Sequence, residues 1–458
     1  MRRLLHFLIV FVAYMSAVVP LDCARASESR DLRIAVVGAG AAGLSAALTL
    51  QDLGFKHVTV FEATSQVGGK ADSVEFGGRV YDMGAILVMP NFSTILGLAN
   101  RFGVPYQDPG MKYLVAQSDG ELIDIMDFPL RQSGPLSLMS AMAAFNHYPN
   151  RDAAAIGSDF AKAPREMNEN FEAFSRRHGF EQVGLGIAPV TVGCGYGYAA
   201  EVPALYWMQL ANSLVPLFQK SMQDARGSGP KTYAAIFTGG YRSLWVAISR
   251  HLDVRLNSPV SRVKRYMDES GQQRIAITAG GTTGEFDRIV IAAPLEKALD
   301  FLDARPEEKN LFSRIKYYPY NVVLFRGRNL PKPAIMFSNA HTTRATAGRL
   351  AGLYNQFAEG DIWTAGQIAS PDMTQEQLET TLREDVASLG GEVLEILRRK
   401  MWSHFPHVST KDLDEGFYQR MSALQGINGT FYSGSIMTFD SAEPAALFAR
   451  DLMLERFR

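Results

Sequence analysis

The stretch RIAVVGAGAAGL, at residues 33–44, decides the fold of this chain. Its first five residues form an apolar run with β-branched members, which predicts a short buried strand. Glycines at 38, 40 and 43 follow in the spacing G-x-G-x-x-G, and residues 44–53 predict a helix that Gly54 ends. Residues 57–61 predict a second strand. A strand, glycine-rich turn, helix and strand in this order predict the βαβ unit of a Rossmann-type α/β domain.

Glu62 closes the second strand, and this context makes the glycine spacing specific for a dinucleotide. Gly38 permits the tight turn, Gly40 lets backbone amides approach a pyrophosphate, and Gly43 lets helix and strand pack closely. The helix N-terminus adds donors and partial positive charge. Glu62 would accept hydrogen bonds from the adenosine ribose. The turn VGGK at residues 67–70 would bring a cation to the same pyrophosphate, with a solvated loop lysine as the alternative.

The first 26 residues resemble a secretory signal peptide. Arg2 and Arg3 give a basic start, residues 4–19 carry no charge, and Ala24-Arg25-Ala26 is a small-x-small cleavage site. Sixteen uncharged residues are few for a membrane span, which needs about 20. We therefore expect export, secreted or periplasmic, with a mature chain that starts at Ser27. An uncleaved anchor and a buried N-terminal helix are the alternatives.

The composition is that of an ordinary globular protein. The chain has 458 residues, 47% hydrophobic and 20% charged, with a net charge of −1, which excludes a disordered chain and gives no general attraction to nucleic acid. This length favours about three domains. After cleavage only Cys194 remains, so no internal disulfide is expected. The eight histidines form no metal-ligand spacing, and we expect no metal.

The rest of the chain alternates between helical and sheet patterns. Helical patterns dominate residues 135–219, and sheet patterns return over residues 254–292 and 318–354. Residues 374–399 predict a helical region that Thr374 and Gln377 open as a capping box. We find no second G-x-G-x-x-G spacing, so we expect one nucleotide and no separate nicotinamide domain.

Further motifs resemble the flavin amine oxidase and phytoene desaturase superfamily. The opening fingerprint, FEA at 61–63, GGK at 68–70, YDMGAI at 81–86, GGYRSL at 239–244 and YSG at 432–434 are similar to its motifs. Within it the likeness is closest to polyenoic fatty acid isomerases, at 67–86, 195–204, 294–297 and 402–439. The resemblance implies an amine-oxidase-like Rossmann FAD domain, an interleaved α+β substrate domain and a helical portion.

The resemblance also implies domain boundaries and a cofactor site. The FAD domain would comprise residues 27–104, 236–300 and 405–458, and the substrate domain residues 105–235 and 301–404. FAD would be non-covalent, because no activating group is evident near Cys194. The expected FAD contacts are Gly38, Gly40, Ala42, Gly43, Glu62, Ala63, Gly69, Lys70, Gly84, Ala85, Ile86, Val260, Gly434 and Ser435. Lys70 replaces the commoner Arg, and Ser435 replaces the usual acid.

The expected substrate residues are Lys112, Tyr113, Tyr196, Tyr198 and Trp207. The isomerase resemblance implies an arginine clamp for a fatty carboxylate near residue 113, but residues 102–130 contain no Arg, and Lys112 is the replacement candidate. The aromatic residues could instead be core. The helix that begins near Ser441 would direct its N-terminus at the flavin.

Three functions remain open. The first is a redox-neutral isomerase of an apolar, unsaturated, fatty-acid-like substrate, in which flavin N5 accepts and returns hydride and no catalytic side chain is named. The second is an FAD-dependent amine oxidase or dehydrogenase of a lipophilic metabolite, and the third a non-catalytic flavin-binding protein. Peripheral contact with a membrane and the oligomeric state are left open.

Overall fold

The computed structural model describes residues 29–224, 234–332, 334–357 and 360–458. The predicted signal peptide lies outside these residues. Within them, no helix is both long and apolar enough to cross a membrane.

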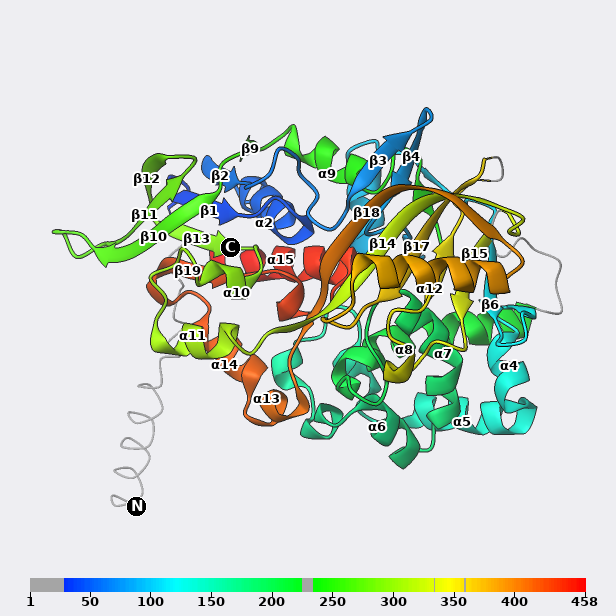
Figure 1. Ribbon diagram of the computed structural model, residues 1–458. Helices are drawn as coiled ribbons and strands as arrows, with labels where there is room; N and C mark the ends of the chain where they lie inside the picture. The colour runs from blue at the N-terminus through cyan, green and yellow to red at the C-terminus, as the bar shows by residue number, and fades with distance from the viewer. Residues whose placement is uncertain (1–28, 225–233, 333, 358–359) are drawn as a thin grey trace, which may run out of the picture.

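A five-stranded parallel sheet carries the predicted βαβ unit (Figure 1). Its strand order is β19-β13-β1-β2-β9. The strands are β1 (Arg33–Val37), β2 (His57–Phe61), β9 (Asp253–Arg255), β13 (Arg288–Ile291) and β19 (Thr430–Tyr432). Helix α2 (Ala41–Asp52) packs against α15 (Ala442–Phe457). Four of the five β1 residues are buried, as expected of a strand covered on both faces.

Smaller elements flank this sheet. They are the antiparallel meander β10 (Val260–Met267), β11 (Gln273–Ala279) and β12 (Thr282–Phe286), the hairpin β3 (Ser73–Phe76) and β4 (Arg79–Asp82), and the helices α3 (Ser93–Arg101), α9 (Arg242–Ser249), α10 (Leu295–Ala298), α11 (Pro306–Phe312), α13 (Thr410–Asp414) and α14 (Phe417–Leu424). Two short strands, β5 (Tyr106–Gln107) and β8 (Ile236–Phe237), pair with each other.

A seven-stranded mixed sheet forms the second half, in the order β18-β14-β17-β16-β15-β6-β7. Its strands are β6 (Lys112–Ala116), β7 (Leu122–Asp124), β14 (Lys316–Arg328), β15 (Ala334–Ser338), β16 (Gly352–Tyr354), β17 (Ile362–Ile368) and β18 (Glu392–His407). Helix α12 (Gln375–Ser388) packs on β18, and a helical portion of α4 (Phe128–Ser133), α5 (Pro135–His147), α6 (Phe171–Arg177), α7 (Glu181–Gly193) and α8 (Ala204–Asp224) lies below it (Figure 1).

The expected helix over residues 374–399 is wrong beyond residue 388. Its capping box is present, since Thr374 Oγ1 accepts from Gln377 N at 3.2 Å and Gln377 Oε1 accepts from Thr374 N at 2.8 Å. Gly390, at φ +79°, follows the helix end, and residues 392–407 then form β18, which pairs with β14. Long-range pairing therefore overrides a locally helical pattern.

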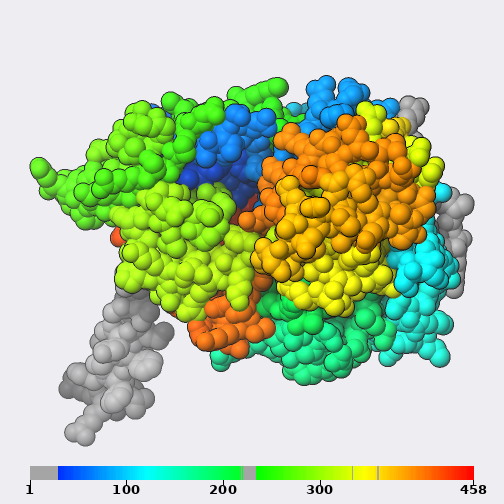
Figure 2. All heavy atoms as spheres, viewed as in Figure 1, coloured from blue at the N-terminus to red at the C-terminus, as the bar shows by residue number. Residues whose placement is uncertain are grey.

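The two large sheets follow the two predicted sets of segments. All strands of the parallel sheet come from the three segments expected to form the FAD domain, whereas the seven-stranded sheet comes from the substrate segments apart from the last residues of β18. In Figure 2 the early part of the chain, in blue, lies between the green segment around β10–β12 and the yellow-orange segment of the second sheet.

Candidate cofactor site

The glycine-rich turn has the geometry that its spacing predicts. Gly38 has φ +101°, and a Cβ on Gly43 would lie 1.9 Å from Gly38 O, so neither position accepts a side chain without strain. A Cβ on Gly40 would instead meet only Gly69 Cα, at 3.8 Å. Helix α2 begins at Ala41 without a side-chain cap, and buried Ala42 lies in its first turn. The helix start is therefore available to an anion.

The segment that leads into β10 is bonded to Glu62 at the end of the parallel sheet. Glu62 Oε2 accepts from Ala39 N at 2.9 Å, and Oε1 accepts from Thr64 N and Oγ1. Ser258 N donates to Glu62 O at 2.8 Å, which brings the start of β10 and Val260 to the same place as Glu62 and exposed Ala63. The structure thus brings together the residues predicted for the adenosine end.

The predicted phosphate and flavin segments also lie side by side. Ala85 N donates to Lys70 O at 3.0 Å, and a Cβ on Gly84 would lie only 1.8 Å from that oxygen. Gly69, at φ +58°, faces Gly40 across the turn, and Ile86 is half-buried. Close backbone approach therefore explains why glycine stands at positions 69 and 84.

Asp440 joins four parts of the chain at this site. Its Oδ2 lies 2.5 Å from Lys70 Nζ and accepts from Phe405 N at 2.7 Å. Its backbone oxygen accepts from the Tyr196 hydroxyl at 3.0 Å, and the Ser435 side chain bonds to its carboxylate. Lys70 therefore points toward the C-terminal motif rather than into bulk solvent.

The charges at Asp440 follow from its surroundings. Burial opposes ionisation, but the positive charge of Lys70 and the hydrogen bonds lower the pKa of Asp440 to about 2. Burial lowers the pKa of His404 to about 4, so this imidazole is neutral at pH 7. Its Nε2 lies 3.0 Å from Cys194 O and its Nδ1 3.3 Å from Asp440 Oδ2. Burial raises the pKa of the Cys194 thiol to about 11, so no thiolate forms at neutral pH.

Phe405 is held in a strained conformation beside Asp440. Its φ is +55°, which is unfavourable for a bulky residue and requires support from the surroundings. The hydrogen bond to Asp440 and contacts with the rings of Tyr196 and Phe439 supply that support. Sequence analysis missed Phe405, His404 and Asp440 as site residues. An acid five residues after Ser435, directly before a helix, is the signal that could have identified Asp440.

The expected substrate residues do not form one set. Tyr196 is half-buried among His404, Phe405 and Phe439, and Tyr198 is buried beneath Arg344. Trp207 is fully buried and donates Nε1 to Tyr196 O at 3.1 Å, so it supports the Tyr196 loop from behind.

Tyr113 and Lys112 alternate along β6, where Tyr113 is buried and Lys112 is exposed.

Among the described residues, no group of His, Cys, Asp and Glu side chains lies close enough together to hold a metal ion.

The predicted C-terminal helix begins at Ala442, and its first turn contains buried Glu443. The Glu443 carboxylate accepts from Thr94 N at 2.9 Å and Ile95 N at 2.8 Å, so it caps α3. Nearby, the Ser433 hydroxyl is buried, and no partner for it exists among the described residues. A buried hydroxyl of this kind points to a ligand group that would complete its hydrogen bonding.

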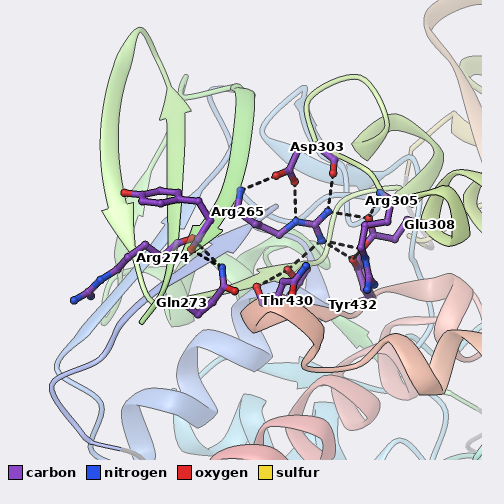
Figure 3. A network of polar contacts seen from close by, with 10 residues as sticks. Arg265, Gln273, Arg274, Asp303, Arg305, Glu308, Thr430 and Tyr432 are labelled. Carbon is purple, nitrogen blue, oxygen red and sulfur yellow. Dashed lines mark hydrogen bonds and ion pairs between the residues drawn. The ribbon is translucent and has the colours of Figure 1, made fainter. Parts of the chain in front are cut away.

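A buried ion-pair network holds the C-terminal motif from the other side (Figure 3). Arg265 on β10 donates to both carboxylate oxygens of Glu308, at 2.8 and 2.9 Å, and to Asp303. The hydroxyl of Tyr432 on β19 donates to Glu308 Oε1 at 2.6 Å. Burial alone would raise the pKa of Glu308, but the hydrogen bonds of Arg265 and Tyr432 lower it to about 2. The meander, α11 and β19 are therefore fixed to one another.

An uncapped helix start after a glycine-rich turn, a carboxylate at the end of the next strand and the close approach of Gly69 to Gly40 define a dinucleotide-binding α/β protein with an added substrate domain. The chain belongs to the flavin containing amine oxidoreductase family, whose model matches residues 41–402. The family implies FAD, and the glycine turn, the Glu62 carboxylate and the buried Ser433 hydroxyl fit such a ligand.

The chain is also similar to three known proteins. A crystal structure of a CLA-producing fatty acid isomerase from P. acnes matches with a TM-score of 0.82 and 28% identity, and covers 94% of this chain and 100% of that one. An FAD-dependent oxidoreductase from Colletotrichum higginsianum is 24% identical over 451 residues, covering 89% of each chain. A polyenoic fatty acid isomerase from Ptilota filicina is 35% identical over 92 residues, which are 20% of this chain and 17% of that one.

Proposed function

We propose that this FAD-dependent family member isomerises double bonds of an apolar, unsaturated, fatty-acid-like substrate. The observation that carries the proposal is the likeness to a fatty acid isomerase over 94% of the chain, with a TM-score of 0.82. Bound FAD would supply the hydride acceptor and donor that such a reaction needs. The cofactor would be held without a covalent bond, and the protonated, half-buried Cys194 thiol supports this.

The side chains around Asp440 suit an apolar substrate. Tyr196, Phe405 and Phe439 pack ring against ring, and neutral His404 keeps its ring nitrogens directed at Cys194 O and Asp440. Burial raises the pKa of the Tyr196 hydroxyl well above its usual value, so it stays protonated and bound to Asp440 O. Half-buried Tyr196 and His404 would therefore be the side chains of this group that can face an apolar substrate, with buried Phe405 and Phe439 packed behind them.

A carboxylate on the substrate would need a cationic partner, since an unpaired buried charge is costly. Lys112 remains the predicted partner, although its side chain is exposed on β6. Arg344 is a second candidate, because its guanidinium lies 5.0 Å from the ring centre of Tyr198 and 5.3 Å from that of Tyr318. It already binds Glu201 through two hydrogen bonds, so a substrate would have to share it.

The test is anaerobic incubation of the holoprotein with polyunsaturated fatty acids, their methyl esters and lipophilic amines. Conjugated-diene absorption without lasting loss of the flavin band would support isomerisation. Variants Lys112→Ala and Arg344→Ala should distinguish the two cations, because only the true partner raises KM for the acid while leaving the ester unchanged. If acids and esters leave the flavin spectrum and their own absorption unchanged, the proposal fails.

The second candidate is net oxidation of an amine or another lipophilic metabolite, which the name of the family favours. In that case, the flavin would stay bleached in the absence of oxygen. Admitting oxygen would restore the yellow colour and release peroxide. Bound FAD that no compound reduces would instead indicate a binding protein.

A further inference from the structure

An apolar patch is exposed where α4, α5 and α7 meet, at one corner of the molecule (Figure 1). Leu136 on α5 is 84% exposed and Met139, one turn further, is 64% exposed. Leu130 on α4 and Leu185 on α7 are also exposed. The Ser133 hydroxyl donates to Gln182 Oε1 at 2.7 Å, which brings the junction of α4 and α5 against the first turn of α7.

Helix α5 exposes two large apolar side chains on its outer face and carries no Asp, Glu, Lys or Arg. Residues 132–150 contain no Asp, Glu, Lys or Arg. The inner face buries Leu138, Met142 and Phe145, while Leu136, Met139 and Ala143 form a stripe on the outer face at helical spacing. Ser137, Ser140 and Asn146 are exposed beside this stripe, so the outer face is mixed. Leu136 and Met139 nevertheless have no cover among the described residues.

We infer that this patch inserts into the interfacial region of a lipid membrane, so that the protein binds a bilayer surface peripherally. The four exposed side chains offer on the order of a few hundred Å² of apolar surface, a size that marks interaction sites. A stable dimer would need about 800 Å² from each partner. Insertion into lipid needs no complementary protein surface, so a patch of this size suits it better.

The charges around the patch indicate which lipid it needs. The neighbouring arginines are already paired: Arg131 with Glu121, Arg151 with Asp152, and Arg176 with Glu172 and Glu181. Among the described residues, these three arginines therefore offer no cationic surplus that would direct the patch to anionic lipids. Binding should rest on apolar insertion, occur on neutral phosphatidylcholine vesicles, and persist from about 0.1 M to about 0.5 M NaCl.

Vesicle co-sedimentation of the full FAD-loaded protein tests the inference. The double variant Leu136→Asp/Met139→Asp should lower the vesicle partition coefficient about tenfold or more, because each inserted side chain contributes at least that much. Met267→Asp is the matched control, since Met267 is 60% exposed on β10, away from the patch, and should bind like the wild type. Both changed positions are exposed, so folding should survive, and Leu136→Gln/Met139→Gln provides a second uncharged pair.

Amide hydrogen exchange shows which segment of the chain contacts the vesicles. Vesicles should slow exchange over residues 134–143 in the wild type and not in the double variant. Unchanged exchange there, or equal vesicle binding by wild type and double variant, would overturn the inference. A wild-type dimer without vesicles that the double variant dissociates would also overturn it, because a second copy would then be the occupant. Vesicle binding needs no substrate, so this result is independent of the proposed reaction.

Discussion

Glu308→Gln tests whether the buried network around Arg265 stabilises the FAD-domain side of the protein. The glutamine keeps the shape of the side chain but removes its charge, so Arg265, whose side chain is 2% exposed, loses its main ionic partner. Breaking a buried pair in this way costs about 3–5 kcal/mol. Arg265 keeps Asp303 at 2.7 Å, so we expect the lower end, about 3 kcal/mol.

Urea unfolding of the holoprotein at pH 7 measures this loss, with Glu307→Gln as the matched control. Glu307 is the adjacent residue and pairs with Arg420 at the surface, where such pairs contribute about 0–1 kcal/mol. The pKa of Glu308 is lowered to about 2 from an ordinary value of 4.5, so its contribution is fully present above pH 4.5 and is lost as pH falls toward 2. The gap between wild type and Glu308→Gln should therefore narrow below pH 4.5. Equal unfolding midpoints for the two variants at pH 7 would refute the reasoning.

Two further substitutions probe the cofactor site, and one N-terminal sequencing experiment tests the leader. Asp440→Asn should weaken FAD binding about tenfold, because Lys70 and Phe405 lose their charged partner; fluorescence titration measures this, and unaltered affinity would contradict it. Gly40→Val should abolish FAD binding in a folded protein, whereas Gly97→Ala, where a Cβ meets nothing within 4 Å, should stay yellow. A colourless but folded Gly97→Ala protein would show that the loss of FAD is not specific to position 40. Protein from its own host should begin at Ser27, and a mature chain that starts at Met1 would rule out signal-peptide cleavage.

Sequence reasoning predicts what local spacing determines. Gly43 must be glycine because a Cβ there would collide with Gly38 O. Both residues belong to the same short glycine-rich motif, so the sequence alone reveals the constraint. The end of α12 shows the opposite case: residues 392–399 look helical locally, but their hydrogen-bonding partners are in β14, about seventy residues earlier.

The Asp440 site could not be read locally for the same reason. Its ion pair with Lys70 spans 370 positions, and no pattern within a helix or strand indicates such a contact. Trp207 shows a further limit, because an aromatic residue that looks suited to a channel wall is fully buried behind Tyr196. The sequence shows that an aromatic residue is present but not whether its side chain faces the substrate or packs behind the Tyr196 loop.

Strand β18 crosses from the substrate sheet to the cofactor side. Lys400 Nζ lies 2.5 Å from Asp72, Trp402 Nε1 donates to Met83 O at 2.7 Å, and Phe405 N donates to Asp440. One continuous strand thus touches two positions before Gly84, Asp72 and Met83, and also the C-terminal motif. A chimera that exchanges substrate domains between relatives should accordingly take residues 392–407 whole from one parent, with the junction outside the strand, as at the Gly390–Gly391 turn. A junction placed inside the strand would combine residues that pair with β14 from one parent with residues that contact the cofactor side from the other.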